Sequence, residues 1–155
     1  MRLSTPVTRM IAVLVASAAV PLAIHREPRA DAPFGRFTDL DCAGTPCVKD
    51  TKTGLVWKKA EQSITYTWSD AKVLCTPSFR LPTIRELQSL LDETRTAAPL
   101  IDASKFPGAT ADWFWSSSPH APSPSTAPSA WALTFLYGNT FHHSTGMKGR
   151  VRCVR

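Results

Sequence analysis

The stretch that most constrains the fold is Arg80-Leu-Pro-Thr-Ile-Arg-Glu-Leu-Gln-Ser-Leu-Leu-Asp92. Thr83 and Glu86 have the spacing of a capping box, in which each side chain accepts a hydrogen bond from a backbone N–H of the other residue. Three leucines then recur at helical spacing and give the segment one apolar face: Leu87, Leu90 and Leu91. The pattern predicts a short helix from about Ile84 to Asp92 that packs by this face against a core.

The residues before this stretch predict a hairpin and another short helix. Val48-Lys-Asp50 and Leu55-Val-Trp-Lys58 flank a turn-like connection, which is typical of a β-hairpin. Thr67 is placed to cap a helix that has Asp70 at its third position. Cys75 falls near the end of that helix on its apolar face, so we expect its side chain to point inward.

The residues after this stretch predict further β structure. Trp113-Phe-Trp-Ser116 begins a second β region, and residues 131–137 alternate in the manner of a strand. The large side chains on one face of that strand would be Trp131, Leu133, Phe135 and Tyr137. Residues 116–129 are rich in proline and serine, so they predict a solvated loop.

The last residues alternate basic and apolar side chains. In a strand, this alternation places Lys148, Arg150 and Arg152 on one face. Val151 and Cys153 then occupy the opposite face. We therefore expect a final strand with one exposed basic face and one buried apolar face.

Residues 1–32 predict a secretory signal peptide. Arg2 and Arg9 supply a positive start, and the apolar run from Met10 to Ile24 is shorter than the roughly 20 residues of a spanning helix. Ala30-Asp31-Ala32 offers a small-x-small cleavage site. An uncleaved N-terminal anchor is the alternative interpretation.

This interpretation divides the chain into three parts. We expect the signal peptide at 1–32, an N-terminal linker at 33–41 and one domain at 42–155, with no transmembrane segment in the mature chain. The protein would then be secreted, periplasmic or on the cell surface. Removal of residues 1–32 takes away four basic and two acidic residues and lowers the formal net charge from +6 to +4. A basic domain of this kind accepts anionic partners, whereas export argues against nucleic acid.

An exported chain with four cysteines suggests disulfides, for which three connectivities exist. Cys42 and Cys47 are close enough to close a small local loop. Cys75 and Cys153 would then join the end of a helix to the final strand. The alternative, a four-cysteine zinc site, lacks the C-x2-C pair typical of such sites.

Several motifs, taken in order, resemble a known family. They are Cys42…Cys47-Val-Lys-Asp-x3-Gly-Leu-Val-Trp57, Thr67-Trp-Ser-Asp-Ala-x3-Cys75, Arg80-Leu-Pro-Thr-Ile-x-Glu-Leu-x-Ser-Leu-Leu91, Phe106-Pro107, Trp115-Ser-Ser117, Trp131 and Val151-Arg-Cys-Val-Arg155. Together they resemble the Lcl C-terminal domain family, named after a bacterial collagen-like surface adhesin. The chain departs from the family at Phe79, where members usually have tryptophan.

The resemblance implies a fold and a class of ligand. The implied fold is α+β and C-type-lectin-like, with two short helices, a small twisted antiparallel sheet, long loops and a disulfide from the first helix to the last strand. The adhesin binds sulfated glycosaminoglycans through this domain. We therefore expect an exported module for surface interaction, with a carbohydrate or other anionic polymer as its partner. The alternative is a structural envelope protein without a discrete ligand.

The candidate ligand-binding residues combine the basic strand with one tryptophan: Lys148, Arg150, Arg152, Arg155 and Trp113. We expect no enzymatic activity and no catalytic residue. The Arg80-Leu-Pro-Thr83 segment also resembles formylglycine-generating enzymes, but those enzymes need a reactive cysteine pair in a much larger domain.

We expect neither a metal nor a cofactor. The triplets of calcium-dependent sugar binders are missing, and nothing in the sequence clusters Asp102 with Asp112. His142 and His143 are adjacent, so on a strand they would face opposite sides. Asp92 and Glu93 are likewise neighbours on a helix and would point in different directions.

Overall fold

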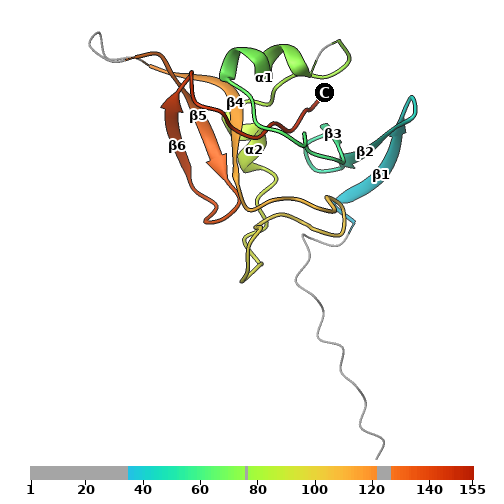
Figure 1. Ribbon diagram of the computed structural model, residues 1–155. Coiled ribbons are helices and arrows are strands. Elements are labelled where there is room, and N and C mark those ends of the chain that lie inside the picture. The colour runs from blue at the N-terminus through green and yellow to red at the C-terminus, as the bar shows by residue number, and fades with distance from the viewer. Residues whose placement is uncertain (1–34, 76, 122–126) are drawn as a thin grey trace, which may run out of the picture.

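The computed structural model describes residues 35–75, 77–121 and 127–155 (Figure 1). These residues form two three-stranded antiparallel sheets, in the orders β1-β2-β3 and β4-β5-β6, together with two short helices. The α+β class expected from the sequence is therefore confirmed. The predicted signal peptide lies outside the described residues. No helix in the described ranges has both the length and the apolar character needed to cross a membrane.

The first sheet contains the predicted hairpin and one strand more. Its strands are β1 (Phe37–Cys42), β2 (Thr45–Asp50) and β3 (Val56–Lys58). β1 occupies residues that we expected to belong to a linker. It is ordered by a full ladder with β2 and by Phe37, which is buried and packs edge-on against Phe106 at 5.5 Å between ring centroids.

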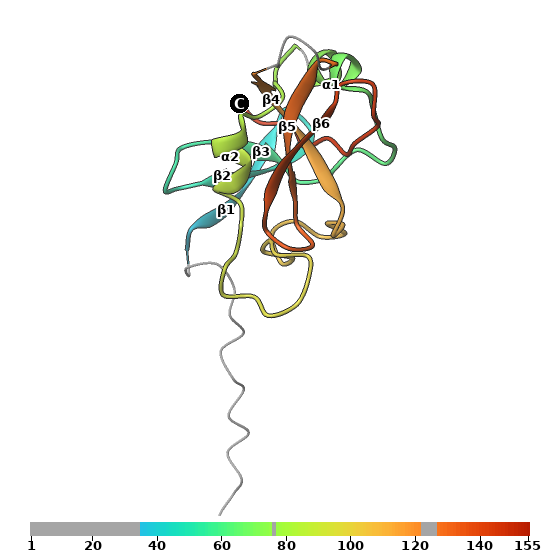
Figure 2. The same ribbon diagram turned by 90° about the vertical axis from the view of Figure 1, so that its left-hand side faces the viewer.

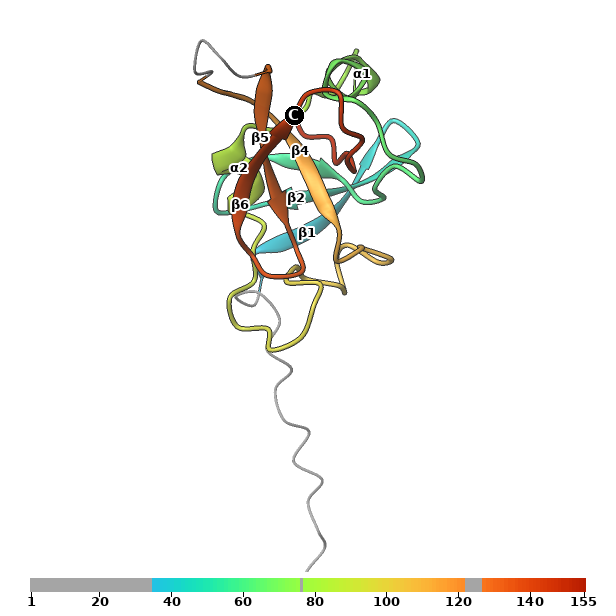
Figure 3. The same ribbon diagram turned by 60° about the vertical axis from the view of Figure 1, so that its left-hand side comes forward.

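The second sheet contains β4 (Trp113–His120), β5 (Ser129–Thr134) and β6 (Thr140–Ser144). All three strands can be followed in Figure 3. Two expectations need correction. β4 continues to His120, into residues predicted as a loop. β5 ends at Thr134, where the N–H of Gly138 donates to the Thr134 carbonyl and closes a turn, so Tyr137 is 75% exposed rather than part of a packed face.

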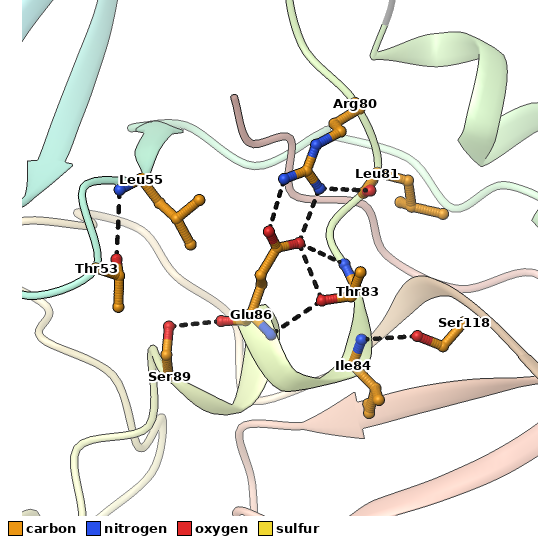
Figure 4. A network of polar contacts seen from close by, with 9 residues as sticks. All are labelled: Thr53, Leu55, Arg80, Leu81, Thr83, Ile84, Glu86, Ser89 and Ser118. Atoms are coloured by element: carbon orange, nitrogen blue, oxygen red, sulfur yellow. Dashed lines mark hydrogen bonds and ion pairs between the residues drawn. The ribbon is translucent and has the colours of Figure 1, made fainter.

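Both predicted helices are present. α1 (Trp68–Leu74) is capped by Thr67, and α2 (Ile84–Gln88) begins with the capping box. Figure 4 shows the Glu86 carboxylate accepting from the Thr83 N–H at 2.7 Å and from the Arg80 guanidinium at 2.6 Å. α2 ends before Asp92, because the next N–H groups bond to carbonyls three residues back, as in a tighter 3₁₀ turn.

The C-terminal segment, residues 149–155, runs between the two sheets (Figures 1 and 2). On one side, the Trp115 N–H donates to the Arg150 carbonyl. On the other side, the Lys58 N–H donates to the Cys153 carbonyl, and Val56 and Arg155 exchange a pair of backbone hydrogen bonds. The segment therefore joins sheets that have no other backbone ladder between them in the described residues.

This placement contradicts the exposed final strand expected from the sequence. The four residues from Val151 to Val154 are all buried, at 0 to 1% exposure. Residues 151–154 have neighbours on both sides and no solvated face, so the basic side chain of Arg152 is buried together with the apolar ones.

Both predicted disulfides are confirmed. Cys42–Cys47 closes the β1–β2 turn, with Cα atoms 6.0 Å apart. Cys75–Cys153 ties the end of α1 to the C-terminal segment, with Cα atoms 5.5 Å apart. All four cysteines are thus in disulfides, which excludes the four-cysteine zinc site.

Candidate functional site

Arg152 is not part of a surface site. Its side chain is 1% exposed, and its guanidinium lies 4.8 Å from the Phe106 ring centroid and 5.7 Å from that of Phe114. It donates to the carbonyls of Lys58 and Lys59 and to the Glu61 carboxylate. Burial lowers the pKa of Arg152 to about 10, although the Glu61 charge opposes this shift. Its role in the structure is to hold residues 58–61 against the core.

Arg150 and Lys148 do not form a row with Arg152. Arg150 is half-buried, and its guanidinium is held by the Asp112 carboxylate at 3.3 Å and the Ser63 carbonyl at 3.1 Å. Lys148 is exposed on the turn that follows β6. The predicted stripe is therefore divided among a buried, a paired and an exposed cation.

Trp113 is half-buried and contacts other side chains extensively. Its ring lies 4.9 Å from Trp115 and 4.8 Å from His143, centroid to centroid. One part of the ring also covers Gly149 so closely that an added Cβ would lie 2.2 Å from Cζ3. The contacts of Trp113 are those of a packing residue. Stacking of its ring on a ligand stays a prediction.

Among the predicted site residues, Arg155 lies beside a cation that the sequence analysis did not single out, Lys58. Its guanidinium carbon is 5.1 Å from the centroid of the Phe79 ring, and Lys58 Nζ is also 5.1 Å from that centroid. Phe79 is 8% exposed, so the ring forms a buried base beneath two cations. Interaction with the electron-rich ring favours this placement of the two charges.

The strand register adds Lys49 to the same surface. Residues paired across a ladder point to the same face of a sheet. Lys49 pairs with Val56, and Val56 in turn pairs through its backbone with Arg155. Lys58 lies two residues beyond Val56 and therefore shares the face. We call Lys49, Lys58 and Arg155 the basic face.

The first sheet separates its charges by sign. The acidic residues of β1 and β2, which are Asp39, Asp41 and Asp50, fall on the face opposite to the basic face by the same register. Asp39 accepts from Lys59 and Lys105 there, and these hydrogen bonds hold its pKa below the ordinary value. Among the described residues, no carboxylate forms an ion pair with Lys49, Lys58 or Arg155.

A cleft of about 540 Å³ borders the basic face at Lys58. Its walls come from the start of β2, the segment after β3 and one residue of the long loop, and include Pro46, Lys59, Glu61 and Pro107. The Glu61 carboxylate there is paired with the Arg152 guanidinium. Most of the lining surface is apolar. This volume lies within the range of roughly 300–1,000 Å³ that small-molecule sites occupy. The cleft is thus large enough for a small ring system next to the cations.

The other sequence candidates have local roles. Asp102 is buried and caps its own loop by accepting from Ser104 and Lys105 N–H groups. Asp92 is 3% exposed whereas Glu93 is exposed, so they form no acid–base pair. In the part of the chain that the structure describes, no three His, Cys, Asp or Glu side chains gather as metal ligands.

Sequence reasoning missed Lys49 and Lys58. The signal was present in the alternation of side chains along the two strands. Val48 and Trp57 are buried, and each directly precedes one of the two lysines. The predicted hairpin would have placed both lysines on one face. Their association with Arg155 could not be read from the pattern, because it depends on the C-terminal segment pairing with β3.

The fold and this surface define a small, disulfide-bonded α+β domain with a segregated basic face. Comparison with protein families matches residues 46–155 to the Lcl C-terminal domain. The chain therefore belongs to the Lcl C-terminal domain family, as its motifs suggested. A search of curated proteins finds no match.

Proposed function

We propose that this domain is an exported binding module for acidic polysaccharides, and that it binds them through the basic face. The observation that carries the proposal is the presence of three cations on one face of a sheet whose acidic residues all lie on the other face. None of the three cations forms an ion pair with a described carboxylate, so a polyanion can bind them without first breaking an internal salt bridge.

The spacing of the three charges suits an extended polymer. Lys49 and Arg155 lie on either side of β3, which separates them by two strand spacings, or about 9–10 Å. Lys58 lies two residues from Val56 along β3, about 6.6 Å further on. Charges repeated along a sulfated or carboxylated chain can contact all three cations at once, whereas a single small anion cannot.

The cleft beside Lys58 supplies a place for a sugar ring. Its mostly apolar lining matches the C–H faces of a pyranose, and Gln62 and Ser63 offer polar groups at its wall. An anionic substituent on that ring would lie near Lys58. The proposed ligand is therefore an acidic glycan rather than an inorganic anion.

Two further parts of the proposal concern compartment and chemistry. Both disulfides are compatible with an oxidising compartment, which supports export. We infer a C-type-lectin-like arrangement, supported by family membership and by the link from α1 to the C-terminal segment. We also propose a non-catalytic role; the reactive cysteine pair of formylglycine-generating enzymes has no counterpart among the described cysteines, which are held in disulfides.

The test is retention on immobilised heparin under a salt gradient. Lys49→Ser, Lys58→Ser and Arg155→Ser combined should elute at low salt, whereas the parent is retained at 0.15 M. The matched control combines Lys72→Ser, Arg85→Ser and Lys148→Ser, which removes the same charge from other exposed positions. The control should be retained like the parent.

Two outcomes would overturn the proposal. Equal loss in both triple variants would show that only net charge matters, and full retention of the basic-face variant would place binding elsewhere. Retention of the parent should weaken as salt shortens the Debye length below about 8 Å. Thermal melting of each variant separates loss of binding from loss of fold.

A further inference from the structure

The Cys42–Cys47 disulfide lies on the same side of the first sheet as the basic face. Cys47 pairs with Lys58 in the β2–β3 ladder, and Leu40 pairs with Cys47 in the β1–β2 ladder. Ladder partners share a face of a sheet, and so do residues two apart on one strand. Cys42 and Cys47 therefore belong to the face that carries Lys58, and their disulfide is set among cations.

Each sulfur of this disulfide has a cation beside it. Arg155 Nη2 donates to Cys42 Sγ at 3.2 Å. Lys58 lies directly opposite Cys47, and the Cβ atoms of such ladder partners are about 4.5–5.5 Å apart. A cation next to a cysteine favours the thiolate over the thiol, and a sulfur that is more stable as a thiolate leaves a disulfide faster. The surroundings of this bridge therefore favour its opening.

Access to solvent separates the two disulfides. Cys42 is 7% exposed, whereas each of the other three cysteines is 1% exposed. The Cys75–Cys153 bridge is enclosed where the C-terminal segment runs between the two sheets. A thiolate in solution therefore reaches Cys42 before any other cysteine of the domain.

The hairpin that carries the disulfide has its own backbone contacts. The β1–β2 ladder runs along the whole of both strands. In the turn between them, the Gly44 N–H donates to the Asp41 carboxylate at 3.0 Å. The strands therefore stay paired when the bridge opens, so the opening is local and reversible.

We propose that Cys42–Cys47 is a thiol-exchange site that accepts an external thiol or dithiol while Cys75–Cys153 stays closed. The incoming thiolate bonds to Cys42 Sγ, and the electron pair of the broken S–S bond leaves on Cys47 Sγ, beside Lys58. The second thiolate of a dithiol then attacks the dithiol's own sulfur in this mixed disulfide and expels the Cys42 thiolate, beside Arg155. The dithiol is oxidised to its disulfide and the bridge is reduced to two cysteines. This exchange modifies the protein without turnover, and it does not depend on the proposed glycan binding.

The experiment is timed reduction of the folded protein with dithiothreitol near neutral pH, followed by alkylation and peptide mass mapping. Cys42 and Cys47 should be alkylated before either cysteine of the other bridge. Arg155→Met should slow this reduction by at least about threefold, because it removes the cation that stabilises the thiolate. Arg155→Lys keeps the charge and should react at nearly the parent's rate. Lys148→Met is the matched control, since it removes an exposed cation from the turn after β6 and should leave the rate unchanged.

A second measurement identifies the sulfur that is attacked. Glutathione, a monothiol, should form its mixed disulfide on Cys42. Added salt should slow reduction of the parent more than that of Arg155→Met, because salt screens the removed charge. Circular dichroism checks the fold of each variant, and Lys58→Met provides the same test if Arg155→Met does not fold. Earlier opening of Cys75–Cys153, a glutathione adduct on Cys47, or parental rates in both methionine variants would overturn the assignment.

Discussion

Trp113 lies directly on Gly149, and the contact leaves no space for a side chain at position 149. An added Cβ would lie 2.2, 2.5 and 2.7 Å from three atoms of the indole ring. Gly149 is buried, and its backbone pairs with that of Tyr66. The contact therefore fixes the path by which the chain enters the C-terminal segment.

Gly149→Ala is expected to destabilise the domain, because the large ring cannot move without disturbing Trp115 and His143. Overpacking of this kind costs about 1–3 kcal/mol. Urea unfolding measures the loss. Gly146→Ala is the control, since no atom lies within 4 Å of a Cβ built there. Equal stability of the two variants would contradict the close contact.

Removal of the Cys75–Cys153 disulfide is expected to cost more than removal of Cys42–Cys47. The first closes a loop with a sequence separation of 78 residues and the second one of 5 residues. In the chain-entropy treatment, these loops correspond to about 4.5 and about 2 kcal/mol. Paired cysteine-to-serine variants and thermal melting test the order. A larger loss for the Cys42–Cys47 variant would show that local strand closure matters more than the long loop.

Arg152→Met is expected to lower the free energy of unfolding by about 3 kcal/mol. The change leaves the Glu61 carboxylate, whose side chain is 10% exposed, without its cation and the Lys58 and Lys59 carbonyls without this donor. Adding Glu61→Gln should recover part of the loss, since the double variant no longer contains an unpaired charge at this largely desolvated position. Urea unfolding of the three proteins measures both effects. No recovery in the double variant would mean that packing against Phe106, rather than charge, dominates.

The capping box should produce an acid-sensitive contribution to stability. The hydrogen bond from Arg80 is the largest effect that lowers the pKa of Glu86 below its ordinary value of 4.5, and burial opposes it. Because the folded-state pKa is depressed, the contribution is present above the ordinary value and is lost as pH falls through the folded-state value.

The measurement is the difference in unfolding free energy between the parent and Glu86→Gln across this pH range. We expect about 1 kcal/mol near neutral pH, shrinking toward zero as the Glu86 carboxylate is protonated. Gln88→Ala serves as the control, because Gln88 lies two residues further along α2 and is exposed. Its effect on the free energy of unfolding should not depend on pH. A constant difference for Glu86→Gln would show that the Arg80 contact adds nothing.

The sequence predicts local structure in this domain better than it predicts the surface. The Thr67 cap, the capping box of α2, the β2–β3 hairpin and the Cys42–Cys47 bridge follow from short-range spacing, and the structure confirms each. The Cys75–Cys153 bridge, also confirmed, was predicted as the pair that remains. The C-terminal residues were misassigned because alternation of basic and apolar side chains predicts a half-exposed strand. Arg152 is buried instead, because two sheets enclose its segment.

Two groupings of surface side chains depend on pairings between segments remote in sequence. Arg155 joins Lys49 and Lys58 only because residues 149–155 pair with β3. His120 meets His142 only because β5 lies between their strands and sets their register. Periodicity within one segment carries no information about either encounter.

The central position of residues 149–155 also imposes an order on the maturation of the domain. Ribosomes add residues from the N-terminus, so β1 and β2 can pair while the rest of the chain is still being made. The Cys42–Cys47 bridge needs only these two strands and can follow as soon as the chain meets an oxidising compartment. The Cys75 thiol has to wait through 78 further residues for Cys153. Until residues 149–155 arrive, the two three-stranded sheets lack the segment that pairs with both of them. The last residues to be made are therefore the ones that join the two sheets and complete the second disulfide.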